Sequence, residues 1–445
     1  MKARYLVASI VLAGMNMPAA LATNGYFSHG YGMKAKGMGG ASVAMAHDAM
    51  GGANNPASMV WVGDRMDLGI DWFRPVRDAS RTGAPTMGGF VQFNGSMGSD
   101  KKNFFIPEFG YNKMLNPSLA LGVTVYGNGG MNTDYQPQTG QYRCFNPLAG
   151  VAFSADNLLC GQGKLGVNLE QLIIAPTLSY KFHPQHSIGI APLFGYQRFA
   201  ADGLQSFAGI STNPGNVTNK GHDTSTGWGV RVGWVGKLND RVTLGATYAS
   251  EMRMSKFDNY SGLFANGGDF DIPSHFALGV AFQATPALTV ALDWMRINYE
   301  DVPAVSNSSR TLGCMPSLVG GTGSACLGGS NGLGFGWQDI NVVKLGVQYK
   351  FNDKLTLRAG YNHGENPIRS EDVTFNILAP GIVRDHLTLG ATYQIAPNSE
   401  LTVAYMHAFE KSVTGLSNNP YFNTGGTEEI KMYQDSIGVT WGMKF

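Results

Sequence analysis

The sequence has few charged residues, and beyond its N-terminus it contains no long apolar run. Only 14% of its 445 residues are Asp, Glu, Lys or Arg, against about 25% in an ordinary soluble domain. No stretch after the N-terminus approaches the roughly 20 apolar residues of a membrane-spanning helix, which excludes a protein with several such helices. The formal net charge of +1 argues against a nucleic-acid partner. Intrinsic disorder is excluded because apolar and aromatic residues recur along the whole length.

Glycine and aromatic residues are abundant instead, with 60 Gly and 11% Phe, Trp and Tyr. From about residue 65 onward, apolar residues occupy every second position, as in 242–248 and in 230–234 before it. This is the period of a strand whose two faces meet different environments. Short turns such as Asn239-Asp240 alternate with long loops. The composition and this alternation are typical of a transmembrane β-barrel.

The pattern gives fourteen strands, an even number, as expected for a bacterial barrel. The sequence therefore predicts an all-β membrane protein, a 14-stranded antiparallel barrel over residues 61–445. The expected strands are 65–78, 103–114, 119–130, 166–182, 187–200, 227–238, 241–256, 274–284, 287–300, 338–351, 355–364, 384–396, 400–411 and 431–445.

The N-terminus has the features of an export signal. Lys2 and Arg4 precede the apolar residues 5–17, and Ala20-Leu21-Ala22 supplies a small-x-small cleavage site. We therefore expect residues 1–22 to be a signal peptide. We place the mature protein in the outer membrane of a Gram-negative bacterium, because an exported chain without a further spanning helix can enter a bilayer only as a barrel.

The four cysteines fit an exported protein. Cys144 and Cys160 lie in one loop-like segment, and Cys314 and Cys326 in another. Four cysteines allow three pairings, of which the local one, 144–160 with 314–326, closes two short loops. No CxxC or partnering His accompanies them, so we expect disulfides rather than a metal site. No cofactor is expected either.

Residues 23–60 have no period-2 pattern and are rich in Gly, with a short helix expected around 41–50. Some 40 irregular residues that precede a barrel must pack somewhere, and we expect them to fill its lumen as a plug. We call this segment the hatch. Pro56 fixes φ and holds Asn55 extended, so Asn55-Pro56-Ala57 can pin the base of the hatch to the wall. The motif Gly37, Gly39 and Gly40 would let the upper part move. A role for the tripeptide in biogenesis alone remains the alternative.

The hatch sequence resembles the N-terminal hatch of the FadL/TodX family of outer-membrane transporters for long-chain fatty acids and aromatic hydrocarbons. The resemblance rests on Gly37-x-Gly39-Gly40-Ala41, Asp48-Ala49 and Asn55-Pro56-Ala57. A second match is Phe257-Asp258-x-Tyr260-x-Gly262-Leu263 with Ile272-Pro273. One departure is Ser58, where many family members have Gly.

The resemblance implies a passive uptake channel, not an enzyme. Substrate would be caught in a groove between loops, pass to a lumen pocket and leave when the hatch shifts. We expect long-chain fatty acids, with aromatic hydrocarbons as the alternative, and an outer-membrane lipase or a structural barrel as distant ones. Partners would be outer-membrane lipid and lipopolysaccharide, and the barrel assembly machinery during biogenesis, with the protein a monomer. The groove residues would be Phe199, Leu204, Phe207, Ile210, Leu263 and Phe264, and lumen cations available to a carboxylate are Arg231, Lys344 and Arg358.

Overall fold

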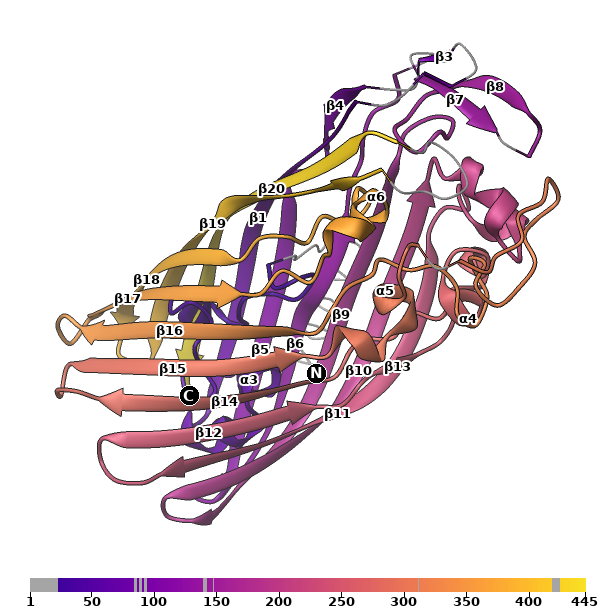
Figure 1. The fold of residues 1–445 in the computed structure, drawn as a ribbon. Helices are drawn as coiled ribbons and strands as arrows, with labels where there is room; N and C mark the ends of the chain where they lie inside the picture. The colour runs from indigo at the N-terminus through magenta and orange to yellow at the C-terminus, as the bar shows by residue number, and fades with distance from the viewer. Residues whose placement is uncertain are drawn as a thin grey trace.

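The computed structural model describes residues 23–445, apart from 84–85, 88–89, 92–93, 139–141, 147, 311 and 418–424. The expected signal peptide lies outside these described residues. Strands dominate the described chain, and its helices are short (Figure 1). None of the helices in that part of the chain is long and apolar enough to cross a membrane.

Within the described residues, fourteen strands form one closed antiparallel barrel, which confirms the predicted fold. The last strand pairs with the first along its whole length, from Arg65–Lys444 to Thr82–Thr427, and the ring leaves no free edge in the barrel. The barrel strands are β1 (Arg65–Thr82), β5 (Phe104–Asn116), β6 (Leu119–Asn132), β9 (Gly166–His183), β10 (His186–Asp202), β11 (Asp223–Lys237), β12 (Val242–Ala249), β14 (His275–Gln283), β15 (Leu288–Ile297), β16 (Ile340–Lys350), β17 (Leu355–Gly364), β18 (Asp385–Ala396), β19 (Ser399–Leu416) and β20 (Thr427–Lys444).

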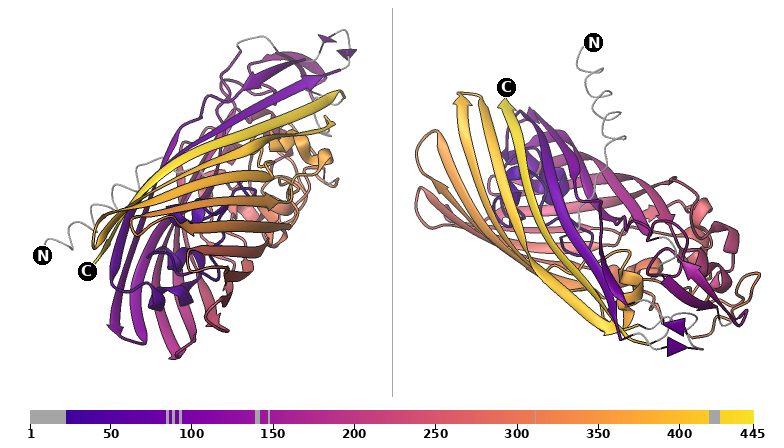
Figure 2. Two further views of the ribbon diagram at one scale, coloured as in Figure 1. Left: turned by 90° about the vertical axis from the view of Figure 1, so that its left-hand side faces the viewer. Right: turned by 90° about the horizontal axis from the view of Figure 1, so that it is seen from above.

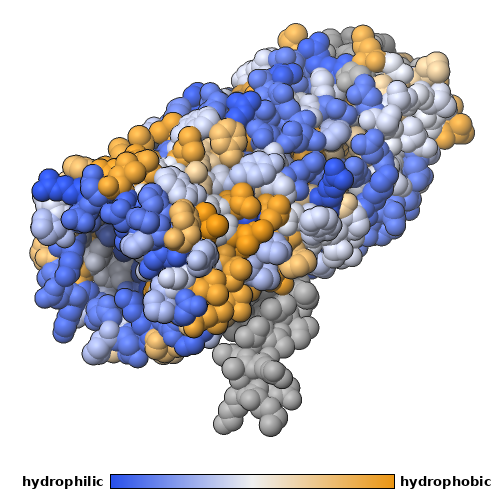
Figure 3. All heavy atoms as spheres, turned by 90° about the horizontal axis from the view of Figure 1, so that it is seen from below, coloured by the Kyte–Doolittle hydropathy of each residue, from blue (hydrophilic) through white to orange (hydrophobic). Residues whose placement is uncertain are grey.

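The barrel is polar inside and apolar outside. On β1, Asp67 and Asp71 are buried in the lumen, whereas Leu68, Ile70 and Trp72 between and beside them are exposed. The surface view shows apolar side chains gathered on the outer wall and hydrophilic ones around the hollow at the end of the barrel (Figure 3). On each strand, the outward side chains are apolar because they face lipid, and the inward side chains are polar because they face the lumen.

One predicted strand is wrong at its end. Strand 241–256 stops at Ala249, because Met252 pairs with Ile272 of the next loop: the Met252 N–H donates to the Ile272 carbonyl at 2.9 Å. The chain then forms only the two-residue β13 (Arg253–Met254), which pairs with β11. In contrast, β1, β19 and β20 continue several residues past their predicted ends because they pair with one another there.

The long loops gather at one end of the barrel and the short turns at the other (Figures 1 and 2). The structure pairs Cys144 with Cys160 and Cys314 with Cys326, both at the loop end. The small elements of the loops are β2 (Thr86–Met87), β3 (Phe90–Val91), β4 (Gly95–Gly98), β7 (Tyr142–Asn146), β8 (Val151–Ala155), η2 (Gln205–Ile210), η3 (Pro214–Asn216), η4 (Asp258–Tyr260), α4 (Ala265–Gly268), η5 (Tyr299–Asp301), α5 (Pro303–Ser306), η6 (Ser370–Asp372) and α6 (Val373–Asn376).

The hatch lies inside the ring of strands (Figure 2). It contains α2 (Met33–Lys36), α3 (Gly51–Asn54) and the start of η1 (Pro56–Trp61). The helix predicted around 41–50 is wrong. The N–H groups of Ser42 and Val43 both donate to the wall carboxylate of Asp293, at 2.7 and 2.9 Å, instead of closing a helical turn.

The hatch lies against glycines of the barrel wall. A β-carbon added at Gly245 or Gly360 would collide with the hatch backbone at Val43 or Met38. Glycine is therefore what permits backbone to lie on backbone at these points. Within the described residues, an added β-carbon would come within 3.1 Å of hatch backbone on eight of the fourteen barrel strands, at Gly110, Gly129, Gly189, Gly245, Gly279, Gly346, Gly360 and Gly390.

This contact predicts an asymmetric effect of two neighbouring substitutions. Gly245→Val adds side-chain atoms where the hatch lies, whereas Ala246→Val adds them on the outward face of the same strand. In purified protein reconstituted into vesicles, we expect Gly245→Val to raise leakage of a small hydrophilic dye several-fold, because the hatch is displaced. Both variants should keep the altered gel mobility of an unboiled barrel. Equal leakage from the two variants would contradict this account of the wall.

Candidate functional site

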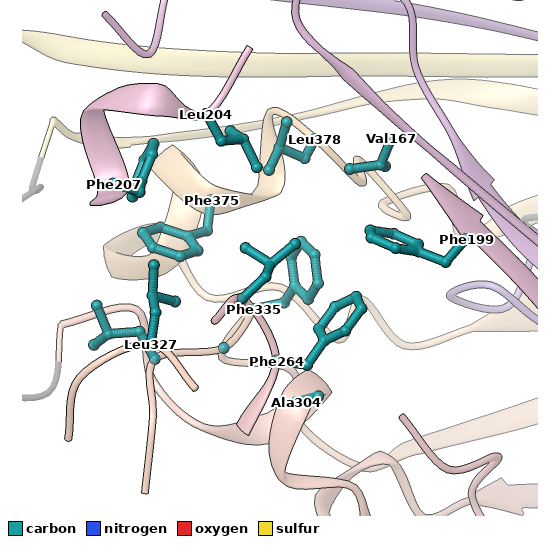
Figure 4. Close-up of a pocket in the computed structure, with 13 residues that line it drawn as sticks. Val167, Phe199, Leu204, Phe207, Phe264, Ala304, Leu327, Phe335, Phe375 and Leu378 are labelled. Carbon is teal, nitrogen blue, oxygen red and sulfur yellow. The ribbon is translucent and has the colours of Figure 1, made fainter. Parts of the chain in front are cut away.

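An apolar cavity lies among the long loops, and the side chains that line it point toward one another (Figure 4). The empty space among its lining residues is about 420 Å³, part of which is open to solvent, and only a small fraction of it is wide enough for a water molecule. None of the thirteen described residues that line it is charged, so it suits the apolar part of a ligand. They are Val167, Phe199, Leu204, Phe207, Leu263, Phe264, Ala304, Leu327, Leu333, Gly334, Phe335, Phe375 and Leu378. We call this space the loop cavity.

Aromatic contacts join β10 and three separate loops around the loop cavity. The Phe199 ring, at the end of β10, lies 4.7 Å from the Phe264 ring beside α4. The Phe207 ring of η2 meets the Phe375 ring of α6 edge-on at 5.3 Å. Each such pair contributes about 0.5–1.5 kcal/mol beyond its buried area. The walls therefore support one another although they come from distant parts of the chain.

Five of the six predicted groove residues line the loop cavity. They are Phe199, Leu204, Phe207, Leu263 and Phe264. The sixth, Ile210, is fully buried just outside the lining. Its carbonyl accepts from the Leu327 N–H at 3.0 Å, next to the Cys314–Cys326 bridge, so it holds Leu327 in the wall rather than lining the space.

The three predicted lumen cations lie away from the loop cavity. Arg231 donates to the carbonyls of Gly52, at 2.9 Å, and Ala53 in the hatch. Arg358 donates to the Thr392 hydroxyl at 2.6 Å and to Gln348 at 2.9 Å. Lys344 is buried in the wall beside Asp293, its register partner on β15. These cations face the hatch and the wall, and none of them lines the loop cavity.

Wall carboxylates bind the hatch from several sides. Lys36 pairs with Asp71 at 2.6 Å, and Lys34 pairs with Glu400 at 2.5 Å. Backbone N–H groups of the hatch donate to others: Gly32 to Glu108 at 3.2 Å and Ala49 to Asp67 at 2.8 Å. Burial lowers the pKa of the Lys36 ammonium, but the carboxylates of Asp71 and Glu108 outweigh it, so the pKa lies above its usual value. Lys36 therefore stays charged, and its ion pair with Asp71 persists.

Asn55 ties the base of the hatch to the wall. It is extended, with φ −144° and ψ 108°, as its place before proline requires. Its Nδ2 donates to the carbonyl of Val43 at 2.8 Å and to the wall carbonyls of Trp234 at 3.0 Å and Ala246 at 3.4 Å. Its Oδ1 accepts from the Ala57 N–H at 3.1 Å and caps η1, which Pro56 begins.

The glycines expected to allow movement are tightly packed in this structure. Gly39 and Gly40 have positive φ, at 67° and 86°, whereas Gly37 is in the right-handed helical region. The Gly39 N–H donates to the Thr388 hydroxyl at 2.8 Å, and its carbonyl accepts from Asn362 at 3.1 Å. The wall thus binds this motif as well as the base of the hatch.

The hatch N-terminus contacts an irregularity in the wall. The register of β6 against β9 shifts between Gly127 and Gly129, which leaves Asn128 as a bulge. Phe27 forms a β-bridge with Gly129, and the Ser28 N–H donates to the Asn128 carbonyl at 3.3 Å. Bulges often occur beside functional sites.

The sequence patterns alone missed more than half of the cavity wall. Leu333, Phe335, Phe375 and Leu378 are apolar residues inside segments that the period-2 pattern assigns to loops. A cluster of large apolar residues in an otherwise Gly- and Ser-rich loop is the signal that could have found them. The wall glycines could also have been found from the sequence. Most of them occupy an inward position between two outward apolar residues, as Gly245 does between Leu244 and Ala246.

Solved outer-membrane channels share this fold over nearly the whole chain. The toluene transporter TodX of P. putida superposes with a TM-score of 0.65 at 20% identity, covering 94% of this chain and 99% of that one. A FadL homologue of Pseudomonas aeruginosa gives 0.67 at 16% identity, with 95% and 100% covered. The toluene transporter TbuX of Ralstonia pickettii gives 0.61 at 17%, with 94% and 99% covered.

The sequence matches the profile of a protein family, although no single curated protein sequence matches the chain significantly. The profile of a family described as outer membrane protein transport protein (OMPP1/FadL/TodX) matches residues 151–445, from β8 to the C-terminus. The chain therefore belongs to the OMPP1/FadL/TodX family of outer-membrane transport proteins and is a transporter of hydrophobic compounds, not an enzyme.

Proposed function

We propose that the protein is a passive channel that captures a hydrophobic compound in the loop cavity and releases it when the hatch moves. The observation that carries the proposal is the uncharged lining of that cavity, held by four loops at the end of a plugged barrel. An apolar solute gains about 25 cal/mol for each Å² of apolar surface removed from water. No energy source is needed to draw it into such a space.

The hatch would be the barrier between the loop cavity and the periplasm. It is attached to the wall by ion pairs and by Asn55, so it must exchange these contacts before a solute can pass. We propose that Asn55, Pro56 and Ala57 hold its base while the Gly37–Gly40 region gives way. The bulge of β6 at Asn128, where the hatch N-terminus is bound, is the side of the wall that we propose for the exit.

For the substrate class, we propose long-chain fatty acids first and aromatic hydrocarbons as the alternative. TodX and TbuX are toluene transporters, and the loop cavity would accept the apolar part of either compound. A fatty acid needs in addition a partner for its carboxylate, and that partner has to lie elsewhere on the path, since the lining of this cavity is uncharged.

A charge in the loop cavity should abolish capture. Leu263→Asp places a carboxylate at the lining, and an unpaired charge in apolar surroundings costs several kcal/mol. We expect uptake of a radiolabelled long-chain fatty acid by a deletion strain carrying this variant to fall about tenfold or more. The matched control is Val319→Asp, an exposed loop position outside the lining, which should transport normally. Normal uptake by Leu263→Asp would mean that this cavity is not the capture site.

Loosening the base of the hatch should change transport without affecting assembly. Replacing both Asn55 and Pro56 by Ala removes the side-chain bonds to the wall, each with a net value of about 1 kcal/mol. We expect uptake to rise about two- to fivefold, with unchanged surface amount. The control Asn54→Ala removes bonds within the hatch only, to Tyr31 and Met50, and should have a smaller effect. Failure of the double variant to reach the membrane would support the biogenesis alternative instead.

A further inference from the structure

The outward face of the barrel changes character on five neighbouring strands, β17 to β20 and β1, which include the first and last strands, side by side in Figure 2. On each strand, an exposed apolar or aromatic side chain is followed, two residues closer to the long loops, by an ionisable one. The exposed side chains are Tyr361, Leu387, Tyr405, Ile437 and Trp72. The ionisable ones are His363, Asp385, His407, Asp435 and Arg74. We call these five ionisable residues, together with Arg384 and Lys411, the outer belt.

The outer belt lies at the level of lipid head groups. In outer-membrane barrels an aromatic girdle marks the boundary between hydrocarbon and head groups, and the long loops lie on the external side. Here Tyr361, Tyr405 and Trp72 form such a girdle, and the belt is on its loop side. The belt therefore faces the head groups of the outer leaflet.

The carboxylates of the outer belt are held by the same arrangement twice. The Tyr361 hydroxyl donates to Asp385 Oδ1 at 2.6 Å, and His363 Nδ1 lies 2.7 Å from the same oxygen. Since a carboxylate only accepts, this Nδ1 is a donor. The next hairpin repeats the arrangement, with both distances 2.9 Å, in Tyr405, His407 and Asp435. Each carboxylate is thus fixed by two neutral neighbours at the lipid surface.

The cations beside these carboxylates have donors to spare. Lys411 Nζ lies 3.1 Å from Asp385, and its side chain is 40% exposed. The Arg74 guanidinium is 3.7 Å from Asp435, too far for a hydrogen bond, and its side chain is 38% exposed. With Arg384, three permanent cations of the belt stand against two carboxylates. An exposed cation at this level is stable when an anionic head group accepts from it.

We propose that the outer belt binds the phosphates of lipid A, the membrane anchor of lipopolysaccharide, with Arg74 and Lys411 as the principal donors. Phosphate is the head-group anion that Arg and Lys bind most strongly. The two cations lie on β1 and β19, which only β20 separates, so their strands are about 10 Å apart and one diphosphorylated head group can meet both. The exposed apolar side chains directly below the belt match acyl chains, which favours a lipid over free phosphate. This surface lies outside the lumen, so the proposal goes beyond the proposed function and is independent of it.

Binding of lipid A by the purified protein in detergent tests the proposal, with native mass spectrometry as the readout. The two probes are lipid A with both phosphates and lipid A from which both have been removed. For Arg74→Gln/Lys411→Gln we expect the affinity for the phosphorylated form to fall about tenfold. Affinity for the phosphate-free form should be unchanged. The matched control is Lys113→Gln/Lys350→Gln, which removes two exposed, ion-paired lysines at the short-turn end and should change neither affinity.

Every outcome decides the question. A selective loss of phosphorylated lipid A in the belt variant alone supports the site. An unchanged affinity, an equal loss of both forms, or an equal effect of the control variant overturns it. Should the belt variant fail to show the gel mobility of a closed barrel, the single variant His407→Gln replaces it, because glutamine keeps a donor for Asp435. We expect that variant to weaken phosphorylated lipid A about threefold, and no change would overturn the proposal.

Discussion

The contact between the hatch and the barrel wall is the constraint on which the rest of the structure depends. The wall is made of glycine where hatch backbone lies on it, and it presents carboxylates where the hatch has donors. A buried carboxylate is stable only with such donors. The hatch is therefore part of the folded wall, and its departure requires water or a solute to replace each lost contact.

This constraint explains the division between the two ends of the lumen. Charged and polar side chains are concentrated where the hatch can satisfy them, as Asp293 and Arg231 show. The loop cavity lies outside that region, so its walls can consist of apolar residues alone. Capture and gating then depend on different residues. A substitution in the loops can change affinity without loosening the hatch, and a substitution at Asn55 can do the reverse.

The barrel was predictable from the sequence because lipid on one side and polar groups on the other impose a period of two on every strand. Prediction failed where tertiary contacts override local preference. Residues 41–50 have the composition of a helix, but the bonds from Ser42 and Val43 to Asp293 come from a strand some 250 residues away. Likewise, five predicted groove residues line the cavity, whereas Phe335 and Phe375 lie there only because the loops fold over it.

The same limit applies to charged residues. Alternation shows that Arg231, Lys344 and Arg358 all occupy strands, but what each of them contacts depends on neighbours from other strands and from the hatch. That information exists only in three dimensions.

The central claim is that a hydrophobic solute passes only when the hatch leaves the wall, and a covalent tether tests it most directly. Lys34 of the hatch and Glu400 of β19 are suited to a pair of cysteines, because their side chains meet at 2.5 Å and two shorter cysteine side chains leave room for a bifunctional methanethiosulfonate linker, which reduction removes. The measurement is fatty-acid uptake by the linked Lys34→Cys/Glu400→Cys protein before and after reduction, with the unmodified protein treated alike. We predict that the linked pair blocks uptake and that reduction restores it. Undiminished uptake through the tethered protein would contradict the claim.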